Sequence, residues 1–187
     1  MLDVHVIIAQ DTPREWVSQC LDSVHEAIDR AGFAIALHIA PFVAGHVGRA
    51  RAAGYAMGSH PYVTCVDDDD YLLPHAFEQM REPLLAGVAA ACTPEFTLQN
   101  GHQRPGASRH HLVAIRRGWI IDHTQWKCCG DVAQLRAVEA DAVDLPSAAY
   151  VHRLYGTSKA RVLRRAHHDE LELARAQPSS HRIALEG

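Results

Sequence analysis

The sequence places four consecutive aspartates, Asp67 to Asp70, directly after a short apolar run. The run, Tyr62-Val-Thr-Cys-Val66, has the length and the β-branched content of a buried strand. Two unit charges about 4 Å apart repel each other by roughly 4 kcal/mol at an effective dielectric constant near 20. Four adjacent carboxylates at the end of a strand therefore require wide solvation or a bound cation, and their oxygen atoms suit a hard divalent ion.

Two strand–helix units precede this acidic segment. Residues 4–9 have the pattern of a strand, and residues 16–28 carry apolar side chains at helical spacing. A second apolar strand is expected over residues 33–39 and a helix of small residues over 47–57, before the strand at 62–66. Because successive βα units predict a parallel sheet, the expected fold is an α/β, Rossmann-like domain with a mainly parallel central sheet flanked by helices.

Later segments extend this pattern. Further elements are expected as a short helix over 76–80, strands over 88–92 and 112–115, a helix over 131–138 and an amphipathic C-terminal helix over 158–175. We expect residues 1–158 to form one domain and residues 159–187 to form a C-terminal helix and tail. That helix could pack on the core or on a second copy in a homodimer.

The composition limits the class of protein. The chain has 187 residues, of which 48% are hydrophobic and 21% charged, as in a soluble globular domain. Its net charge is −4, and this charge balance does not indicate nucleic acid as a partner. The apolar stretches are shorter than the roughly 20 residues of a membrane span, and the N-terminus has no basic signal region, so a cytoplasmic protein is expected. The five cysteines are scattered and indicate no disulfide or zinc site.

Three segments resemble family-two glycosyltransferases of the GT-A type. Residues 6–24 resemble the first strand and helix of that family, residues 48–54 its Ala-Arg-Asn-x-Gly helix, and residues 62–74 its strand with Asp-x-Asp-Asp and Leu-Pro. The resemblance covers residues 4–80 and is thin beyond them. It implies a single GT-A domain over residues 1–158 that moves a sugar from a nucleotide-diphosphate sugar, linked to UDP or GDP, to an unknown acceptor, with metal help and inversion.

The resemblance assigns a Mn²⁺ or Mg²⁺ site to the acidic segment. Asp67 and Asp69 match the carboxylates that hold the ion, with Asp68 between them, and Asp69 is the expected direct ligand. Four adjacent aspartates leave this register open by one residue. The alternative is that Asp69 and Asp70 cap a helix that starts near Pro74.

The resemblance also implies contacts to the nucleotide sugar, because loops at the carboxyl ends of parallel strands line the ligand crevice. The expected donor-binding residues are Ala9, Gln10, Asp11, Thr12, Arg51, Asp67, Asp68, Arg153 and Ser158. The turn residues 10–12 could instead satisfy only their own backbone, and Arg51 could instead pair with a structural acid.

The segment His152-Arg-Leu-Tyr-Gly-Thr-Ser158 resembles a family segment that closes over the diphosphate and supplies a metal-binding histidine. Tyr155 stands at the position of that histidine. Either His152 serves as the third metal ligand from a shifted register, or the third protein ligand is absent.

Asp131 is the candidate catalytic base. An inverting transferase needs a carboxylate that takes the proton of the acceptor hydroxyl group. The segment Cys129-Gly-Asp131 resembles the Gly-Glu-Asp segment of the family, with one acid in place of two. The alternative is that Asp131 caps a surface helix.

The fourteen histidines include the adjacent pair His110 and His111. Neighbours on one strand or helix point to different faces, and neither this pair nor His167-His168 has the spacing of a zinc motif. We expect His110 or His111 to border the acceptor cleft.

Two other functions stay open. A nucleotidyltransferase on a similar sheet would also use acidic strand ends, although the sequence has no Gly-x-x-x-x-Gly-Lys loop. The other open function is that of a non-catalytic nucleotide-sugar-binding protein derived from a transferase. The chain is short, and it departs from the family at the base segment, at the histidine position and after the second strand.

Overall fold

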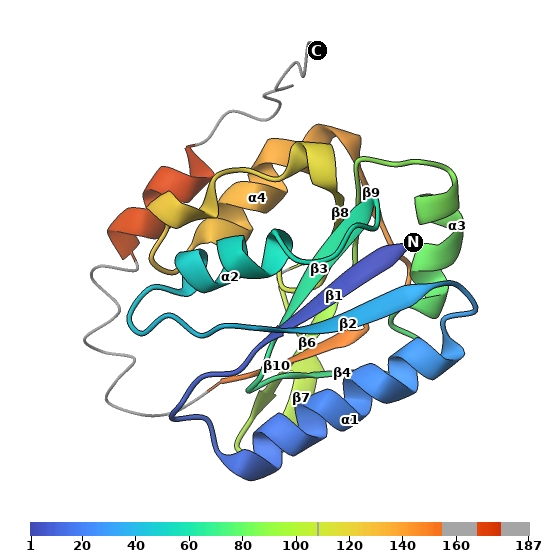
Figure 1. Cartoon of the computed structure of the whole chain (residues 1–187). Coiled ribbons are helices and arrows are strands. Elements are labelled where there is room, and N and C mark those ends of the chain that lie inside the picture. Colours follow the sequence, from blue (N-terminus) through green and yellow to red (C-terminus); the bar gives the residue numbers. More distant parts are fainter. Residues whose placement is uncertain (108, 155–167, 177–187) are drawn as a thin grey trace.

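The computed structural model describes residues 1–107, 109–154 and 168–176, and within them a six-stranded sheet carries the fold (Figure 1). Its strand order is β2-β1-β3-β8-β5-β9. β1 pairs in parallel with both β2 and β3, and β5 pairs in parallel with β9. β8 runs antiparallel to β3 and to β5. The predicted α/β fold with a mainly parallel central sheet is confirmed.

The first half of the chain forms the predicted strand–helix units. Their bounds are β1 Leu2–Ile7, α1 Arg14–Arg30, β2 Ile35–Ala40, α2 Val47–Tyr55 and β3 Tyr62–Asp67. β1 is buried along its whole length because helices cover both faces of the sheet. Leu2, Val4 and Val6 join the core under α1, whereas Ile7 packs in the cluster under α2.

The second half adds shorter elements. The expected helices over 76–80 and 131–138 and the expected strands over 88–92 and 112–115 are present with bounds shifted by a few residues, and further short elements were not expected. The elements of this half, with 3-10 helices labelled η, are η1 Glu78–Met80, α3 Arg81–Leu85, β5 Ala90–Cys92, β8 Val113–Arg116, η2 Arg117–Trp119, η3 His123–Gln125, α4 Gly130–Val138, η4 Glu139–Asp141 and β9 Ala142–Asp144.

A second sheet lies beside the end of β3. It has the order β4-β10-β6-β7, with β4 Tyr71–Leu72, β6 Glu95–Gln99, β7 His102–Pro105 and β10 Tyr150–Arg153. β10 pairs with β4 in antiparallel and with β6 in parallel orientation. This sheet, absent from the sequence-based expectation, brings residues 150–153 to the aspartates that follow β3.

The C-terminal helix is described over residues 168–175, and its expected first part and the expected boundary between residues 158 and 159 lie outside the described residues. Ala174 is buried in a cluster with Trp126, Cys129 and Ala133 of the α4 region. Of the two expected placements, the described part of this helix therefore packs on the core. Figure 1 shows it on the same side of the sheet as α2 and α4, opposite α1.

Two buried polar groups of β1 face α2. Asp3 accepts hydrogen bonds from the His60 amide (2.8 Å) and from Arg117 (2.6 Å), and its Oδ1 lies 2.9 Å from a ring nitrogen of His38. The His5 ring, two residues along, stacks on His38 at 5.2 Å. These groups lie in and beside the strand that forms the centre of the parallel half of the sheet.

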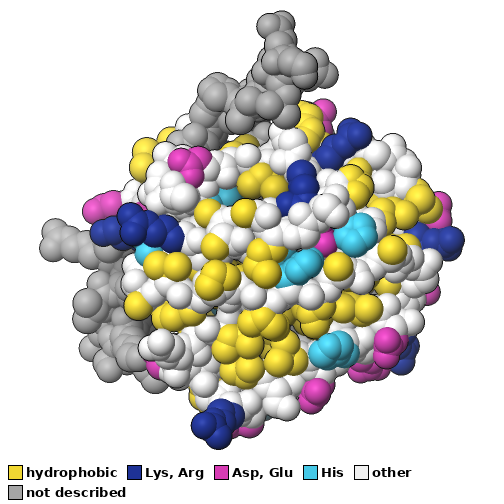
Figure 2. All heavy atoms as spheres, in the orientation of Figure 1, with side chains coloured by type: hydrophobic (Ala, Val, Ile, Leu, Met, Phe, Trp, Pro, Cys, Tyr) yellow, Lys and Arg dark blue, Asp and Glu magenta, His cyan; other side chains and the backbone are white. Residues whose placement is uncertain are grey.

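The surface over β2 is less polar than the rim of the molecule. Figure 2 shows hydrophobic side chains gathered near the middle of the face in view, over this edge strand, and Ile39 of β2 is 49% exposed.

Across the described residues, the helices are all too short or too polar to span a membrane.

Candidate functional site

The aspartates at the end of β3 differ in their surroundings. Asp67 is half-buried at the end of β3, and its two carboxylate oxygens lie 3.3 and 3.0 Å from one guanidinium nitrogen of Arg51. Asp68 is buried and accepts a 2.7 Å hydrogen bond from the backbone amide of Ala9 and another from the Thr12 side chain. Burial raises the pKa of Asp68. Asp68 thus holds the β1–α1 loop against the acidic segment.

Asp70 is fully buried and binds to β10. Its carboxylate accepts 2.7 Å hydrogen bonds from the Tyr150 hydroxyl and from the Arg153 amide, and lies 3.0 Å from Nδ1 of His152. The predicted alternative, that Asp70 caps the following helix, is wrong, because its oxygens bond to β10 and the described helices η1 and α3 have no side-chain cap. Asp70 is therefore a buried structural residue that ties the acidic segment to β10.

Arg51 lies between two carboxylates. It is buried on α2, and its second guanidinium nitrogen lies 3.2 Å from Oδ1 of Asp131. Burial alone would raise the pKa of Asp131, but the charge of Arg51, assisted by His110, outweighs burial and lowers this pKa to about 2. Asp131 is therefore ionised at neutral pH. It lies inside the first turn of α4, one residue after the helix begins, so it is not the predicted N-cap.

An open cleft of about 700 Å³ lies in front of this arginine. It is bordered by α2, by the loop before β8, by α4 and by the helix 168–175. Its lining residues are Val47, Arg51, Asp67, Ala107, Arg109, His110, His111, Cys128, Cys129, Asp131, Val132, Leu135, Arg136, His152, Leu171 and Arg175. The predicted residues Asp67, Asp131, His152 and Arg51 thus share one cleft, whereas Asp69 is not among its lining residues.

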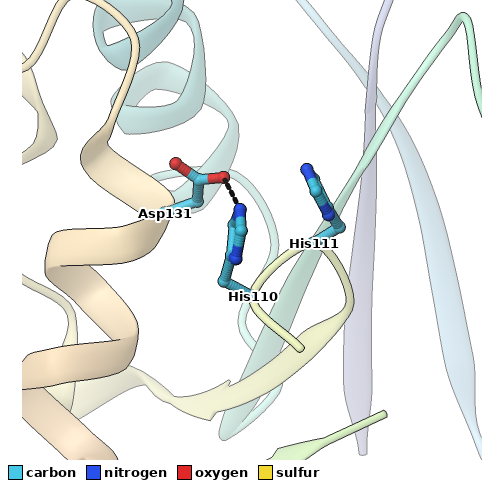
Figure 3. A group of neighbouring side chains, drawn as sticks. All are labelled: His110, His111 and Asp131. Atoms are coloured by element: carbon cyan, nitrogen blue, oxygen red, sulfur yellow. Dashed lines mark ion pairs between the residues drawn. The ribbon is translucent and has the colours of Figure 1, made fainter. Parts of the chain in front are cut away.

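Both members of the histidine pair face this cleft, where one was expected to. They precede β8 in a loop, so the strand alternation does not apply, and their rings lie 4.2 Å apart. Nε2 of His110 lies 3.4 Å from Oδ2 of Asp131. Figure 3 shows the two rings and the carboxylate reaching into the same space from two segments of the chain.

His152 lies beside this pair. Its ring stacks on that of His111 at 4.3 Å. Burial works to lower the pKa of His152, but the hydrogen bond from its ring to Asp70 outweighs burial and raises this pKa to about 9. A metal ion that binds His152 has to displace that proton.

Glu95 is a site residue that sequence reasoning missed. This buried carboxylate at the start of β6 pairs with Nδ1 of His111. The two residues are 16 positions apart, one at the start of the β6–β7 hairpin and one beyond its end, and neither lies in a segment with a recognisable motif.

The other residues that were predicted to bind the nucleotide sugar differ in their exposure. Arg153 is buried, donates to the Asp69 carbonyl and to Gln19, and stacks over Trp16 at 5.2 Å. Its guanidinium thus ties β10 to α1. Gln10 and Asp11 are exposed in the β1–α1 loop. Ser158 lies outside the described residues.

No family model matches this sequence, and no curated protein matches it. Solved structures of the S. aureus glycosyltransferase TarS do resemble the fold. TarS 1-349 in complex with UDP has a TM-score of 0.65 at 13% identity, over 97% of this chain and 67% of that one. The same fragment with UDP-GlcNAc has a TM-score of 0.58 at 11% identity, over 84% and 59% of the two chains. A longer TarS structure has a TM-score of 0.60 at 13% identity and is covered to 40% of its length. At these identities the likeness shows a glycosyltransferase-like fold.

Proposed function

We propose that this chain is a metal-dependent glycosyltransferase of the family-two type, which moves a sugar from a UDP- or GDP-linked donor to an acceptor with inversion. One observation carries the proposal: Asp67 and Asp131 lie on either side of the buried Arg51 and line the same cleft at the carboxyl end of β3. In parallel α/β sheets ligands bind in this position. The fold shared with TarS, whose structures contain UDP and UDP-GlcNAc, supports the same assignment.

Asp67 and Asp69, with His152 as third ligand, are the proposed metal-binding residues. Asp67 and Asp69 are half-buried carboxylates of the acidic segment, and His152 lines the cleft with Asp67 and would add one imidazole. This donor set fits Mn²⁺, which accepts both oxygen and imidazole ligands, better than Mg²⁺. The ion would neutralise the charge that develops on the diphosphate leaving group.

The nucleotide would bind on the β1–α1 side of the acidic segment. Residues 9–12 form the loop that Asp68 holds in place, and Gln10 and Asp11 of that loop are exposed to a ligand. Arg51, buried at the floor of the cleft, would face the diphosphate. Ordered loop residues of this kind position a donor without taking part in the chemistry.

Asp131 is the proposed base. As the acceptor oxygen forms a bond to the anomeric carbon, the bond from that carbon to the diphosphate oxygen breaks, and the hydroxyl proton passes to Oδ2 of Asp131. The pair with Arg51 keeps Asp131 ionised before the reaction and holds its side chain toward the cleft.

A non-catalytic nucleotide-sugar-binding protein is the second candidate. The observation that favours it is that both oxygens of Asp131 already have partners, Arg51 at 3.2 Å and His110 at 3.4 Å. A protein of this kind would bind the donor and transfer nothing.

Calorimetric titration with UDP, GDP and their sugars, with and without Mn²⁺, tests the donor site. We expect Mn²⁺-dependent binding of one nucleotide series, lost in Asp69→Ala and retained in Asp29→Ala, which removes an exposed carboxylate from α1. Failure of the folded protein to bind any of these compounds would contradict the proposal. Binding without sugar transfer or donor hydrolysis would favour the second candidate.

A further inference from the structure

His110, His111 and Asp131 form a compact group of metal-ligating side chains at the cleft (Figure 3). Their ligand atoms all lie within 4.8 Å of one another. The histidines come from the loop before β8, and the aspartate comes from α4. We propose that this group binds a transition-metal cation of the Zn²⁺ type, at a site separate from the aspartates that the proposed function assigns to the donor's metal.

The spacing of the group suits one ion. Bonds from Zn²⁺ to nitrogen and oxygen are about 2.0 to 2.2 Å long, so two ligands of a tetrahedral ion lie roughly 3.3 to 3.5 Å apart. Nε2 of His110 and Oδ2 of Asp131 are already 3.4 Å apart. The ligand atom that His111 offers lies within 4.8 Å of each of these two.

A second partner orients two of the ligands. Glu95 occupies Nδ1 of His111, which leaves Nε2 as the nitrogen that this ring offers to an ion. Arg51 holds Oδ1 of Asp131, while Oδ2 faces His110. Carboxylates that bond to the outer nitrogen of a histidine are a recurrent part of metal sites, because they fix the tautomer and the ring orientation.

The donor atoms select the class of cation. Two imidazoles with one carboxylate suit Zn²⁺ and Co²⁺, whereas Mg²⁺ and Ca²⁺ prefer sites made of oxygen atoms alone. Three protein ligands beside an open cleft leave a fourth position for water or an added ligand.

A second group in the described part of the chain, Cys128, Cys129 and Glu170, is less suited to an ion. The Cys128 thiol donates a 2.5 Å hydrogen bond to Glu170, and burial raises the pKa of both thiols. Zinc binds the thiolate, so this group would first have to lose its protons. Glu170 also accepts hydrogen bonds from the backbone amides of Lys127 and Cys128.

The test is a titration of the EDTA-treated full chain with Zn²⁺ by calorimetry and with Co²⁺ by visible absorption. In the absence of nucleotide, whose diphosphate would complete the donor's metal site, we expect one tightly bound ion per chain, and binding of that ion should be lost in His110→Ala and in Asp131→Asn. Glu95→Gln, which keeps the shape of a positioning residue, should weaken the affinity by roughly 10- to 100-fold. Asp69→Ala and Cys128→Ser should bind as the unmodified protein does. Circular dichroism establishes that each variant is folded, and His110→Gln replaces His110→Ala where the latter is not.

Three results would overturn the inference. The folded protein could fail to bind Zn²⁺, or the His110 variants could bind it unchanged, or a thiolate-to-cobalt absorption band abolished in Cys128→Ser could place the ion at the cysteines. None of these measurements requires a nucleotide sugar or a transfer assay. The metal site can therefore be tested apart from the proposed transferase activity. Both assignments use Oδ2 of Asp131, so an ion bound there would take the proposed base out of use, and transfer is expected of the chain free of Zn²⁺.

Discussion

Arg51 and Asp131 form an ion pair at the floor of the cleft, with 3.2 Å between Nη1 and Oδ1, and the same guanidinium reaches Asp67 through its other nitrogen at 3.0 Å. One buried cation thereby holds the end of β3 at a fixed distance from the first turn of α4. The Arg51 side chain is only 7% exposed. Without it, solvation by water would not fully compensate either carboxylate for the lost ion pair.

Arg51→Gln should therefore reduce the free energy of unfolding by about 3 kcal/mol, because it leaves two carboxylates without their cation in a poorly solvated site. Urea denaturation at neutral pH measures the loss. Arg30→Gln is the matched control, since Arg30 pairs with Glu26 at 3.2 Å on the exposed face of α1 and should cost less than about 0.5 kcal/mol. Equal losses in the two variants would show that the buried bridge does not stabilise the cleft.

Gly58 and Gly87 both have positive φ angles, +71° and +78°, but differ in what surrounds them. A Cβ atom at Gly58 would overlap the carboxylate of Asp3, whereas at Gly87 it would meet nothing within 4 Å. Both alanine variants bear the strain of a left-handed backbone. Gly58→Ala should lose roughly 1 to 3 kcal/mol more than Gly87→Ala, because Asp3 must move away from its buried partners. Thermal unfolding of both variants measures this difference, and equal midpoints would contradict it.

The order of the first five elements could be predicted from the sequence because each has its own local period and the turns between them are polar. The site was harder to predict. Asp70 and Tyr150 are 80 positions apart, and the 2.7 Å hydrogen bond between them depends on β10, a short strand with no distinct sequence pattern. Asp67, Arg51 and Asp131 could be proposed from a family resemblance, whereas Glu95 and the common orientation of His110 and His111 depend on loop geometry.

The buried ring of His5 should make the free energy of unfolding depend on pH. The described structure provides no hydrogen-bond partner for either of its ring nitrogens, and burial, followed by the charges of His38 and Arg117, lowers its pKa from 6.5 to about 4. The unfolded chain therefore binds a proton between these values that the folded chain does not bind. The contribution of the neutral His5 ring to the free energy of unfolding is fully present above pH 6.5 and is lost as the pH falls toward 4.

The contribution of His5 to the whole of this loss should be roughly 3 to 4 kcal/mol, at about 1.4 kcal/mol per pKa unit. His5→Leu removes the titrating ring, so its free energy of unfolding should fall less steeply than that of the unmodified protein between pH 7.5 and 4.5. The difference at pH 7.5 gives the effect of packing alone and serves as the internal reference. Parallel pH profiles would show that His5 is not responsible.

Asp131→Asn tests the proposed base, because the amide keeps the size of the side chain but cannot take the proton of the acceptor. In chelator-treated buffer with Mn²⁺ then added back in excess, we expect sugar transfer or donor hydrolysis to fall by roughly 10²- to 10⁴-fold. Donor affinity should change little, since the proposed donor contacts lie on the Asp67 side of Arg51. Asp141→Asn, an exposed acid beyond the end of α4, is the control and should leave the rate unchanged. An unchanged rate in Asp131→Asn would assign the base to another residue, whereas equal loss of rate and of donor affinity would assign Asp131 to binding rather than to catalysis.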